Sequence, residues 1–202
     1  EALPFVLDPR KAMAPGAPQL FDSKPRNLCG ETHSEDDGYH QTAGAPGLLR
    51  FDNWYHTPMV QHCHLENHIC FAYSEGGKLT VCTSTQIPHI VRRIVGQALG
   101  IPWGKVRIIK PYVGGGFGNK QDALYEPLCA WLSVQVGGRC VVLDCSREET
   151  FVSNRVRHPF DIHLITHVQP DGTLAARRAE IWSRQGAYTS HGHGVLENAV
   201  SA

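Results

Sequence analysis

The stretch ICFAYSEGGKLTVCT, residues 69–83, predicts a β-hairpin and with it the start of a sheet. Two apolar runs, residues 69–73 and 79–83, flank the turn sequence Glu75-Gly76-Gly77-Lys78. Glycine adopts the positive φ angles that tight hairpin turns require, and β-branched and aromatic residues favour the strands on either side. We therefore expect two antiparallel strands to open a folded domain here.

The residues after this hairpin predict a helix, a strand and a second helix. Ser84 and Thr85 are suited to cap the first helix, and Gly100 to end it. Its apolar face consists of Ile87, Ile90, Val91, Ile94, Val95, Ala98 and Leu99. A strand over residues 105–109 follows, and after a glycine-rich segment the second helix carries a stripe of Leu124, Leu128, Trp131, Leu132 and Gln135. Pro127 either kinks this helix or marks its start.

A third helix and a second hairpin complete the pattern. Residues 139–144 are an apolar run of the kind found in buried strands, and Ser146 with Glu149 spells a capping box for a short helix. Apolar and polar residues alternate over 160–168, and residues 173–182 can pair with them across a turn. The order β-β-α-β-α-β predicts an α+β fold in which a two-layer mixed β-sheet carries helices on one face.

The N-terminal part of the chain is different in character. Residues 1–60 hold about half of the chain's 13 prolines and show no sustained helical or strand period. We expect residues 1–60 to form an irregular lead-in arm and residues 61–202 to form one domain. Because the chain begins at Glu1 rather than at Met, we also expect it to be part of a longer polypeptide.

The composition predicts a soluble globular protein, since 42% of the residues are apolar. Its 19 basic and 19 acidic residues cancel, so we expect neither a nucleic acid nor a membrane as partner. No apolar run approaches the roughly 20 residues that cross a bilayer, and the expected location is cytoplasmic. The seven cysteines are odd in number and never spaced as C-x-x-C, so we expect reduced packing residues.

The glycine-rich segment is VGGGFGNKQ, residues 113–121. A Walker loop is excluded because Asn119 precedes Lys120 and Gln121 takes the place of Ser or Thr. A dinucleotide fingerprint would place Asn119 at its last glycine, which makes that match weak. A tight turn between strand and helix needs fewer glycines than occur here. The segment therefore favours a backbone that offers several N–H donors to a deeply bound, oxygen-rich or anionic cofactor.

Four motifs occur in one order, namely TSTQ at 83–86, GGGFGNK at 114–120, RHPF at 157–160 and QGAYTSHG at 185–192. Together with YHTPMVQHCHLEN at 55–67, they resemble the molybdenum-binding subunit of xanthine dehydrogenases, in the xanthine oxidase/aldehyde oxidase family. The resemblance covers essentially the whole chain. It implies that residues 61–202 are the first half of a molybdopterin (molybdenum cofactor)-binding domain.

The resemblance also implies roles for individual residues. Gln86 matches the glutamine whose side-chain amide reaches a molybdenum oxo ligand, and Phe117 matches the residue that contacts the metal centre through its main-chain N–H. Gly116 and Gly118 would allow this approach. Gln121 lies where purine-oxidising relatives carry a substrate-binding glutamate and aldehyde-oxidising relatives an apolar residue, so the substrate stays open. The family's catalytic glutamate would lie beyond this chain, so we expect no catalytic residue in it and no turnover by the isolated chain.

The implied function is the hydroxylation of purines or related N-heterocycles with oxygen derived from water, by a xanthine dehydrogenase-type molybdenum hydroxylase. The implied cofactors are molybdenum–molybdopterin and, on partner domains or subunits, iron–sulfur clusters and FAD. The implied partners are the remaining half of the molybdenum domain, the iron–sulfur and flavin subunits, and a small heterocycle or aldehyde. Two alternatives stay open: an aldehyde oxidase-type substrate, and a cofactor-free interaction domain of the same fold.

Several side chains near these motifs admit more than one interpretation. Lys120 is either a counter-charge for the cofactor's pyrophosphate or a solvated surface residue. The ring of Phe117 alternatively plugs the core beneath the glycine segment. The trios His62-Cys63-His64 and His191-Gly192-His193 lack the separated partners of a closed zinc site, and we interpret them as packing or surface residues.

Overall fold

The computed structural model describes residues 5–35 and 38–200 and divides the chain into two compact units. One unit is Gln61–Arg157, and the other combines the described residues up to Val60 with those from His158 onward. The glycine-rich segment lies entirely in the unit Gln61–Arg157. The expectation that residues 61–202 form the first half of a cofactor-binding domain stays a prediction.

A mixed sheet forms one layer of the unit Gln61–Arg157. Its strands are β2 (Ile69–Glu75), β3 (Lys78–Thr83), β4 (Val106–Ile109) and β5 (Val141–Asp144), in the order β4-β3-β2-β5. β2 pairs antiparallel with β3 and β5, whereas β3 and β4 are parallel. The hairpin at residues 69–83 is therefore confirmed, and so is the order β-β-α-β-α-β.

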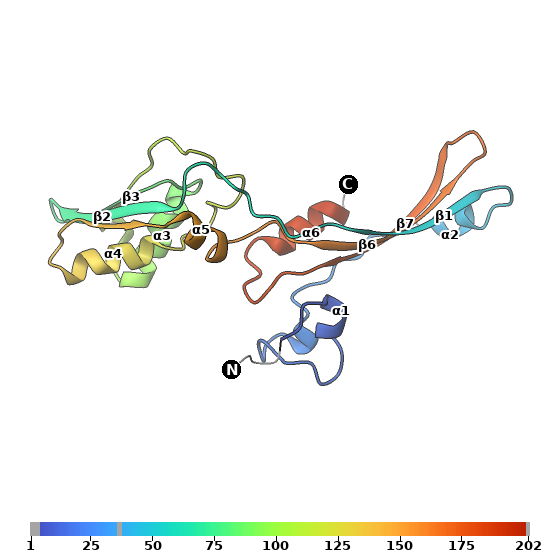
Figure 1. The fold of residues 1–202 in the computed structure, drawn as a ribbon, viewed down its shortest axis with the longest axis horizontal. Coiled ribbons are helices and arrows are strands. Elements are labelled where there is room, and N and C mark those ends of the chain that lie inside the picture. Colours follow the sequence, from blue (N-terminus) through green and yellow to red (C-terminus); the bar gives the residue numbers. More distant parts are fainter. Residues whose placement is uncertain (1–4, 36–37, 201–202) are drawn as a thin grey trace. The chain divides into compact units, whose positions relative to one another are not determined.

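Two helices form the second layer. α3 (Pro88–Leu99) and α4 (Glu126–Gln135) lie on the same face of the sheet (Figure 1). The core between the layers consists of Cys70, Ala72, Leu79, Val81, Val91, Val95, Val106, Cys129 and Ala130. The predicted α+β architecture, with a two-layer mixed sheet and helices on one face, is confirmed.

The start of α3 differs from the prediction. Its N-cap is Ile87, which has no capping side chain, and Pro88 occupies the first helical turn. The Thr85 hydroxyl instead accepts a hydrogen bond from the Ile87 N–H at 3.1 Å. The physical reason is that proline at the first helical position sets the helical φ and needs no donor partner. The end at Gly100 is confirmed, since its φ of 65° closes the helix in the left-handed conformation.

The predicted stripe of α4 is wrong, although the helix itself is confirmed. Leu128 and Trp131 are 49% and 45% exposed, whereas Cys129, Ala130 and Ser133 are buried. Pro127 lies at the first turn and therefore marks the start of the helix, not a kink. The small side chains let α4 approach the sheet closely, which turns the larger apolar residues outward.

The remaining elements of this unit are short. η2 (Trp103–Lys105) precedes β4, and α5 (Arg147–Val152) follows β5. The capping box of α5 is confirmed, because Ser146 Oγ accepts from the Glu149 N–H and the Glu149 carboxylate accepts from the Ser146 N–H. The buried strand expected over residues 139–144 is only half-buried, because β5 lies at an edge of the sheet.

The other unit contains a separate antiparallel sheet in the order β1-β6-β7. β6 (Phe160–Val168) and β7 (Leu174–Ser183) form the predicted second hairpin. β1 (Leu49–His56) pairs with β6 along its length, although residues 1–60 were expected to be irregular. All 8 residues of β1 are exposed. This strand therefore has no alternation of buried and exposed residues from which it could be predicted.

Short helices accompany this second sheet. They are α1 (Pro9–Ala12), η1 (Pro25–Asn27), α2 (Tyr39–Ala43) and α6 (Gly192–Val200). α2 and α6 both contact β7. Among residues 5–35 and 38–200, no helix has the length and apolar character that crossing a membrane requires.

Candidate functional site

The glycine-rich segment packs closely against two other parts of its unit. A Cβ on Gly114 would lie 2.6 Å from Glu66 Cβ, and a Cβ on Gly116 would lie 2.5 Å from Gln86 Oε1. Gly115 and Gly118 have φ angles of 97° and 91°, which side chains disfavour. Two reasons thus explain the glycines of this segment. Some leave room for the side chains of Glu66 and Gln86, which pack directly against the backbone, and others adopt positive φ angles.

The segment nevertheless leaves a run of main-chain donors unused. The N–H of Gly114 donates to Glu66 Oε2 at 3.0 Å, and that of Gly118 donates to Gln86 Oε1 at 3.1 Å. Between them, the N–H groups of Gly115, Gly116 and Phe117 have no acceptor in the part of the chain that the structure describes. Neighbouring N–H groups in such a bend form a concave site for an oxygen-rich or anionic group.

Gln86 is held against this bend by one main-chain and one side-chain hydrogen bond. Its main-chain N–H donates to the Lys120 carbonyl at 2.9 Å, and its Oε1 is the acceptor for Gly118. The acceptor end of the side chain is therefore committed to the loop. Its Nε2 group, which donates to no other residue at positions 5–35 or 38–200, is left as a neutral donor beside the three main-chain N–H groups.

Phe117 and Gln121 both reach solvent. Phe117 has a φ of 52°, an unusual backbone conformation for a residue with a side chain, and is 73% exposed. Its ring therefore does not plug the core, and that interpretation was wrong. Gln121 is exposed as well. The structure thus gathers Gln86, Gly116, Phe117 and Gly118 at one bend and puts Gln121 shortly after it in the chain.

Lys120 fits neither of its two interpretations. Its side chain is 1% exposed, and its Nζ donates to Glu66 Oε2 at 2.5 Å and to Ser84 Oγ at 3.0 Å. A buried ammonium group needs a compensating charge and hydrogen bonds, and Glu66 and Ser84 supply them. Lys120 is consequently an internal support that ties the glycine segment to the chain before β2, rather than a ligand for phosphate or a surface residue.

Glu66 is the centre of this support. Burial by itself raises the pKa of its carboxyl, but hydrogen bonds from Lys120, Ser84 and the Gly114 N–H outweigh burial and hold the pKa below the ordinary 4.5. The carboxylate is therefore ionised at neutral pH. One side chain in this way fixes the first glycine, the TSTQ motif and Lys120 together.

A second polar cluster lies under the end of the glycine segment. Asn119 is fully buried, and its Nδ2 contacts Gln61 Oε1, His64 Nε2 and Asn154 Oδ1 at 3.0–3.2 Å. Asn154 in turn contacts His68 Nδ1 at 3.1 Å. Burial, with the nearby His64 and Lys120, lowers the pKa of His68 to about 4. Burial lowers the pKa of His64 as well, so both histidines are neutral hydrogen-bonding groups of the scaffold at neutral pH, in agreement with the interpretation of His64 as a packing residue.

Two arginines connect the C-terminal end of the unit to the same scaffold. Arg147, at the start of α5, donates to the carbonyl oxygens of His64 and Leu65 at 2.8 Å each. Arg155 donates to the Gly118 carbonyl at 3.2 Å and pairs with Asp122. Sequence reasoning missed both arginines and Glu66. The only available signal was that His64 and Glu66 lie in the motif at 55–67.

The described residues contain no group of three or more His, Cys, Asp or Glu side chains that is arranged to hold a metal ion. The seven cysteines are free thiols. What the described bend offers is a set of hydrogen-bond donors, which a cofactor that brings its own metal ligands could accept. The donor set at the bend fits such a group, because it consists of neutral N–H groups suited to oxo or phosphate oxygens.

Comparison with known proteins gives a consistent result. A family model described as the molybdopterin cofactor-binding domain matches residues 20–202. The chain is 44% identical over 196 residues to the xanthine dehydrogenase molybdenum-binding subunit of Escherichia coli O157:H7, which covers 96% of the chain and 26% of that subunit. It is 37% identical over 150 residues to the nicotinate dehydrogenase large molybdopterin subunit of Eubacterium barkeri, covering 74% of the chain and 35% of that subunit.

A solved structure of aldehyde oxidoreductase from Desulfovibrio gigas matches with a TM-score of 0.78 at 22% identity, over 91% of this chain and 20% of that one. At this identity the match shows the fold. The chain thus spans about a quarter of the length of the xanthine dehydrogenase subunit it matches. From the family match over residues 20–202 and the identity to these subunits, the chain belongs to the molybdopterin cofactor-binding domain family and is a fragment similar to the molybdenum-binding subunit of xanthine dehydrogenase.

Proposed function

We propose that this chain supplies one wall of the molybdenum-cofactor site of a xanthine dehydrogenase-type hydroxylase, which oxidises purines or related N-heterocycles with oxygen from water. The observation that carries the proposal is the convergence of donors at one bend. The N–H groups of Gly115, Gly116 and Phe117 lie beside the Gln86 amide, and within the described residues they have no acceptor. Membership of the molybdopterin family supports a cofactor as their acceptor.

The roles of the residues follow from their donor groups. When bound, the molybdenum group supplies oxygen transfer from water and takes up electrons from the substrate. Gln86 would donate from Nε2 to an oxo oxygen, and Phe117 would donate from its main-chain N–H. Because both donors are neutral, they polarise an oxygen atom without adding charge to the site. Gly116 would keep the bend free of a Cβ, since that space already holds the Gln86 side chain.

Gln121 bears on the substrate class. A carboxamide can donate to and accept from the edge of a heterocycle, but it cannot carry negative charge at neutral pH. The similarity to subunits of xanthine and nicotinate dehydrogenases supports an N-heterocycle. An aldehyde is the second candidate, which is favoured by the absence of a glutamate at this position.

The rest of the machinery would come from outside the chain. We propose that the remaining half of the molybdenum domain contributes the other cofactor contacts and the catalytic base, and that iron–sulfur and flavin groups on partner domains or subunits accept the electrons. The isolated chain would then bind half of a site and show no turnover.

The test uses the full-length parent enzyme. We expect it to contain molybdenum and pterin, and we expect Gln86→Ala to lower kcat by roughly 10²-fold or more, since removal of one oxyanion donor has an effect of this size. Gln97→Ala, an exposed glutamine on α3, is the matched control and should leave kcat unchanged. A folded parent enzyme without molybdenum would overturn the proposal and indicate a cofactor-free interaction domain.

The substrate class is tested with the same enzyme. Turnover of xanthine and hypoxanthine above that of an aromatic aldehyde supports the heterocycle, and the reverse order supports the aldehyde. Gln121→Glu should raise the preference for purines if this residue contacts the substrate. An unchanged ratio of kcat/KM values would exclude Gln121 from the substrate site.

A further inference from the structure

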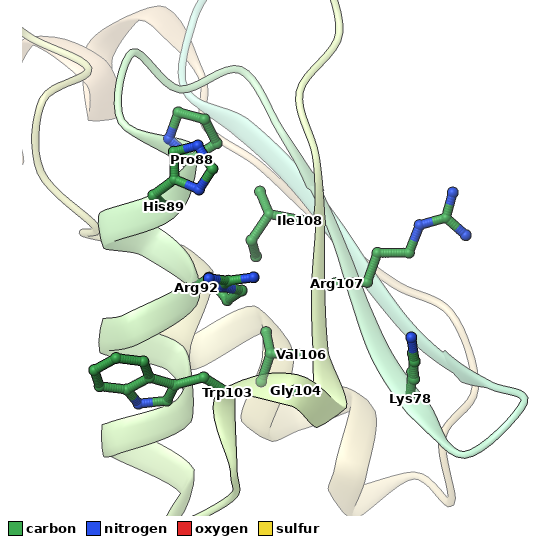
Figure 2. A pocket seen from close by; sticks show the side chains of 9 residues that line it. All are labelled: Lys78, Pro88, His89, Arg92, Trp103, Gly104, Val106, Arg107 and Ile108. Atoms are coloured by element: carbon green, nitrogen blue, oxygen red, sulfur yellow. The ribbon is translucent and has the colours of Figure 1, made fainter.

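An open groove lies at the free edge of the sheet in the unit Gln61–Arg157. β4 is the outer strand of the order β4-β3-β2-β5, and in the described chain its second edge pairs with no strand. A cavity of about 360 Å³ opens along β4 and is lined by residues of α3, η2, β4 and the first residue of β3 (Figure 2). An unpaired strand edge presents N–H and C=O groups that an extended chain can bind. None of the groove's residues belongs to the glycine bend.

The groove carries a local excess of positive charge. Lys78, Arg92 and Arg107 line it together with His89, and no acidic residue does. Lys78, Arg92 and Arg107 form no ion pair with any residue that the structure describes. The sequence contains no Asp or Glu between Glu75 and Asp122. Since the formal net charge of the whole chain is +0, this excess is a property of the groove and its surroundings.

The cations lie on both faces of the edge strand. In Figure 2, Val106 and Ile108 point toward α3, where Arg92 lies, whereas Arg107 and Lys78 lie on the other side of β4. Successive side chains of an added strand would point to opposite faces of the sheet. Acidic side chains on both faces of such a strand would therefore each meet a cation.

The groove also offers an apolar surface at one end. Trp103 of η2 lines it and is 48% exposed. Its ring packs against α3, because a Cβ on Gly96 would lie 2.7 Å from Trp103 Cδ1. A partly exposed tryptophan packed against a helix in this way is a typical anchor for a bound side chain.

We propose that this groove binds an extended acidic segment of a separate polypeptide, which adds a strand to the free edge of β4. The positive charge of the groove favours an acidic occupant, and the same charge favours a separate polypeptide over a permanent interface. The cores of permanent interfaces are apolar and depleted in charge, whereas lysine and arginine side chains at an accessible groove steer the encounter of two molecules. The inference is independent of the cofactor site, because it uses none of its residues.

Charged side chains at a sheet edge have a second known role, which is to prevent unwanted pairing of strands. That role is satisfied by charges of either sign. Reversal of the charges therefore separates the two explanations, since it leaves a protective edge intact but abolishes attraction for an acidic segment.

The first experiment is zero-length carbodiimide coupling of the full-length parent enzyme purified with its natural partners. We expect the Lys78 amino group to be joined to an Asp or Glu of a different polypeptide, as identified by mass spectrometry. Lys11, which is exposed on α1 and does not line the groove, is the internal control for random coupling. Coupling of Lys78 only within its own polypeptide, or no more coupling than Lys11 shows, would overturn the proposal.

The second experiment reverses two charges. Arg92→Glu with Arg107→Glu should slow association with the partner polypeptide by roughly ten-fold or more at low salt, and high salt should reduce the difference. Arg93→Glu with Arg139→Glu is the matched control, since both residues are exposed and lie outside the groove. Circular dichroism verifies that each variant is folded. Equal association rates for the two double variants would refute an acidic partner in the groove.

Discussion

Removal of the Glu66 carboxylate should destabilise the unit Gln61–Arg157 more than any change at an exposed carboxylate. Glu66→Ala would leave the Lys120 ammonium, whose side chain is 1% exposed, without its counter-charge. Among residues 5–35 and 38–200, the one remaining partner would be the Ser84 hydroxyl, at 3.0 Å from Nζ. The Gly114 N–H would also lose its acceptor.

The magnitude follows from these contacts. Breaking one partner of a buried ion pair costs about 3–5 kcal/mol. The Glu66 side chain is 29% exposed, so water screens part of the interaction, and we expect the lower end, about 3 kcal/mol. Glu75→Ala, at the exposed end of β2, is the control and should change the unfolding free energy by less than about 0.5 kcal/mol.

A double-mutant cycle separates the ion pair from packing. Glu66→Gln and Lys120→Met should each be destabilising, but together they should cost less than the sum of the two single changes. The reason is that the double variant contains neither charge, whereas each single variant leaves one charge without its partner. Urea-induced unfolding measures the free energies, with fluorescence from Trp103 and Trp131 after Trp54 and Trp182 have been replaced by phenylalanine.

The pH dependence gives an independent measurement of the same group. Because the pKa of Glu66 in the folded protein lies below 4.5, its contribution to stability is present above pH 4.5 and is lost as the pH falls through the folded value. Glu66→Gln should remove this acid-sensitive part. Additive single changes in the cycle, or a Glu66→Ala variant as stable as Glu75→Ala, would show that the pair does not support the glycine segment.

Three further predictions concern the scaffold and the bend. As the pH is lowered from 6.5 to about 4, the unfolding free energy should fall by up to about 3 kcal/mol. The reason is that His68 takes up a proton in the unfolded chain but stays neutral in the folded protein, where its pKa is about 4. NMR titration of the His68 ring measures this pKa. Gly116→Ala should displace Gln86, whose Oε1 lies 2.5 Å from the new Cβ, and lower the molybdenum content of the parent enzyme, whereas Gly104→Ala, with no atom within 4 Å, should not. Ser146→Ala should remove the capping box and cost about 1 kcal/mol, with faster amide hydrogen exchange in α5 as the local readout.

Local sequence patterns were sufficient for most of the elements. The hairpin at 69–83, the capping box at Ser146 and the second hairpin each depend on residues close together in the chain, and all three are confirmed. The glycine segment and Gln86 were also identified from short motifs, and the structure brings them into contact. The strand β1 escaped detection because its residues are exposed and carry no pattern of burial.

Only the tertiary structure decided what surrounds these elements. The helical period of α4 identified a stripe, but the sheet packs against its small residues Cys129 and Ala130, since they allow the closest approach. The burial of Lys120 depends on Glu66, which lies 54 residues away in the chain. Backbone preferences and turn chemistry act over a few neighbouring residues and can be recognised in the sequence. The environment of a charge is determined by groups that meet only when the chain has folded.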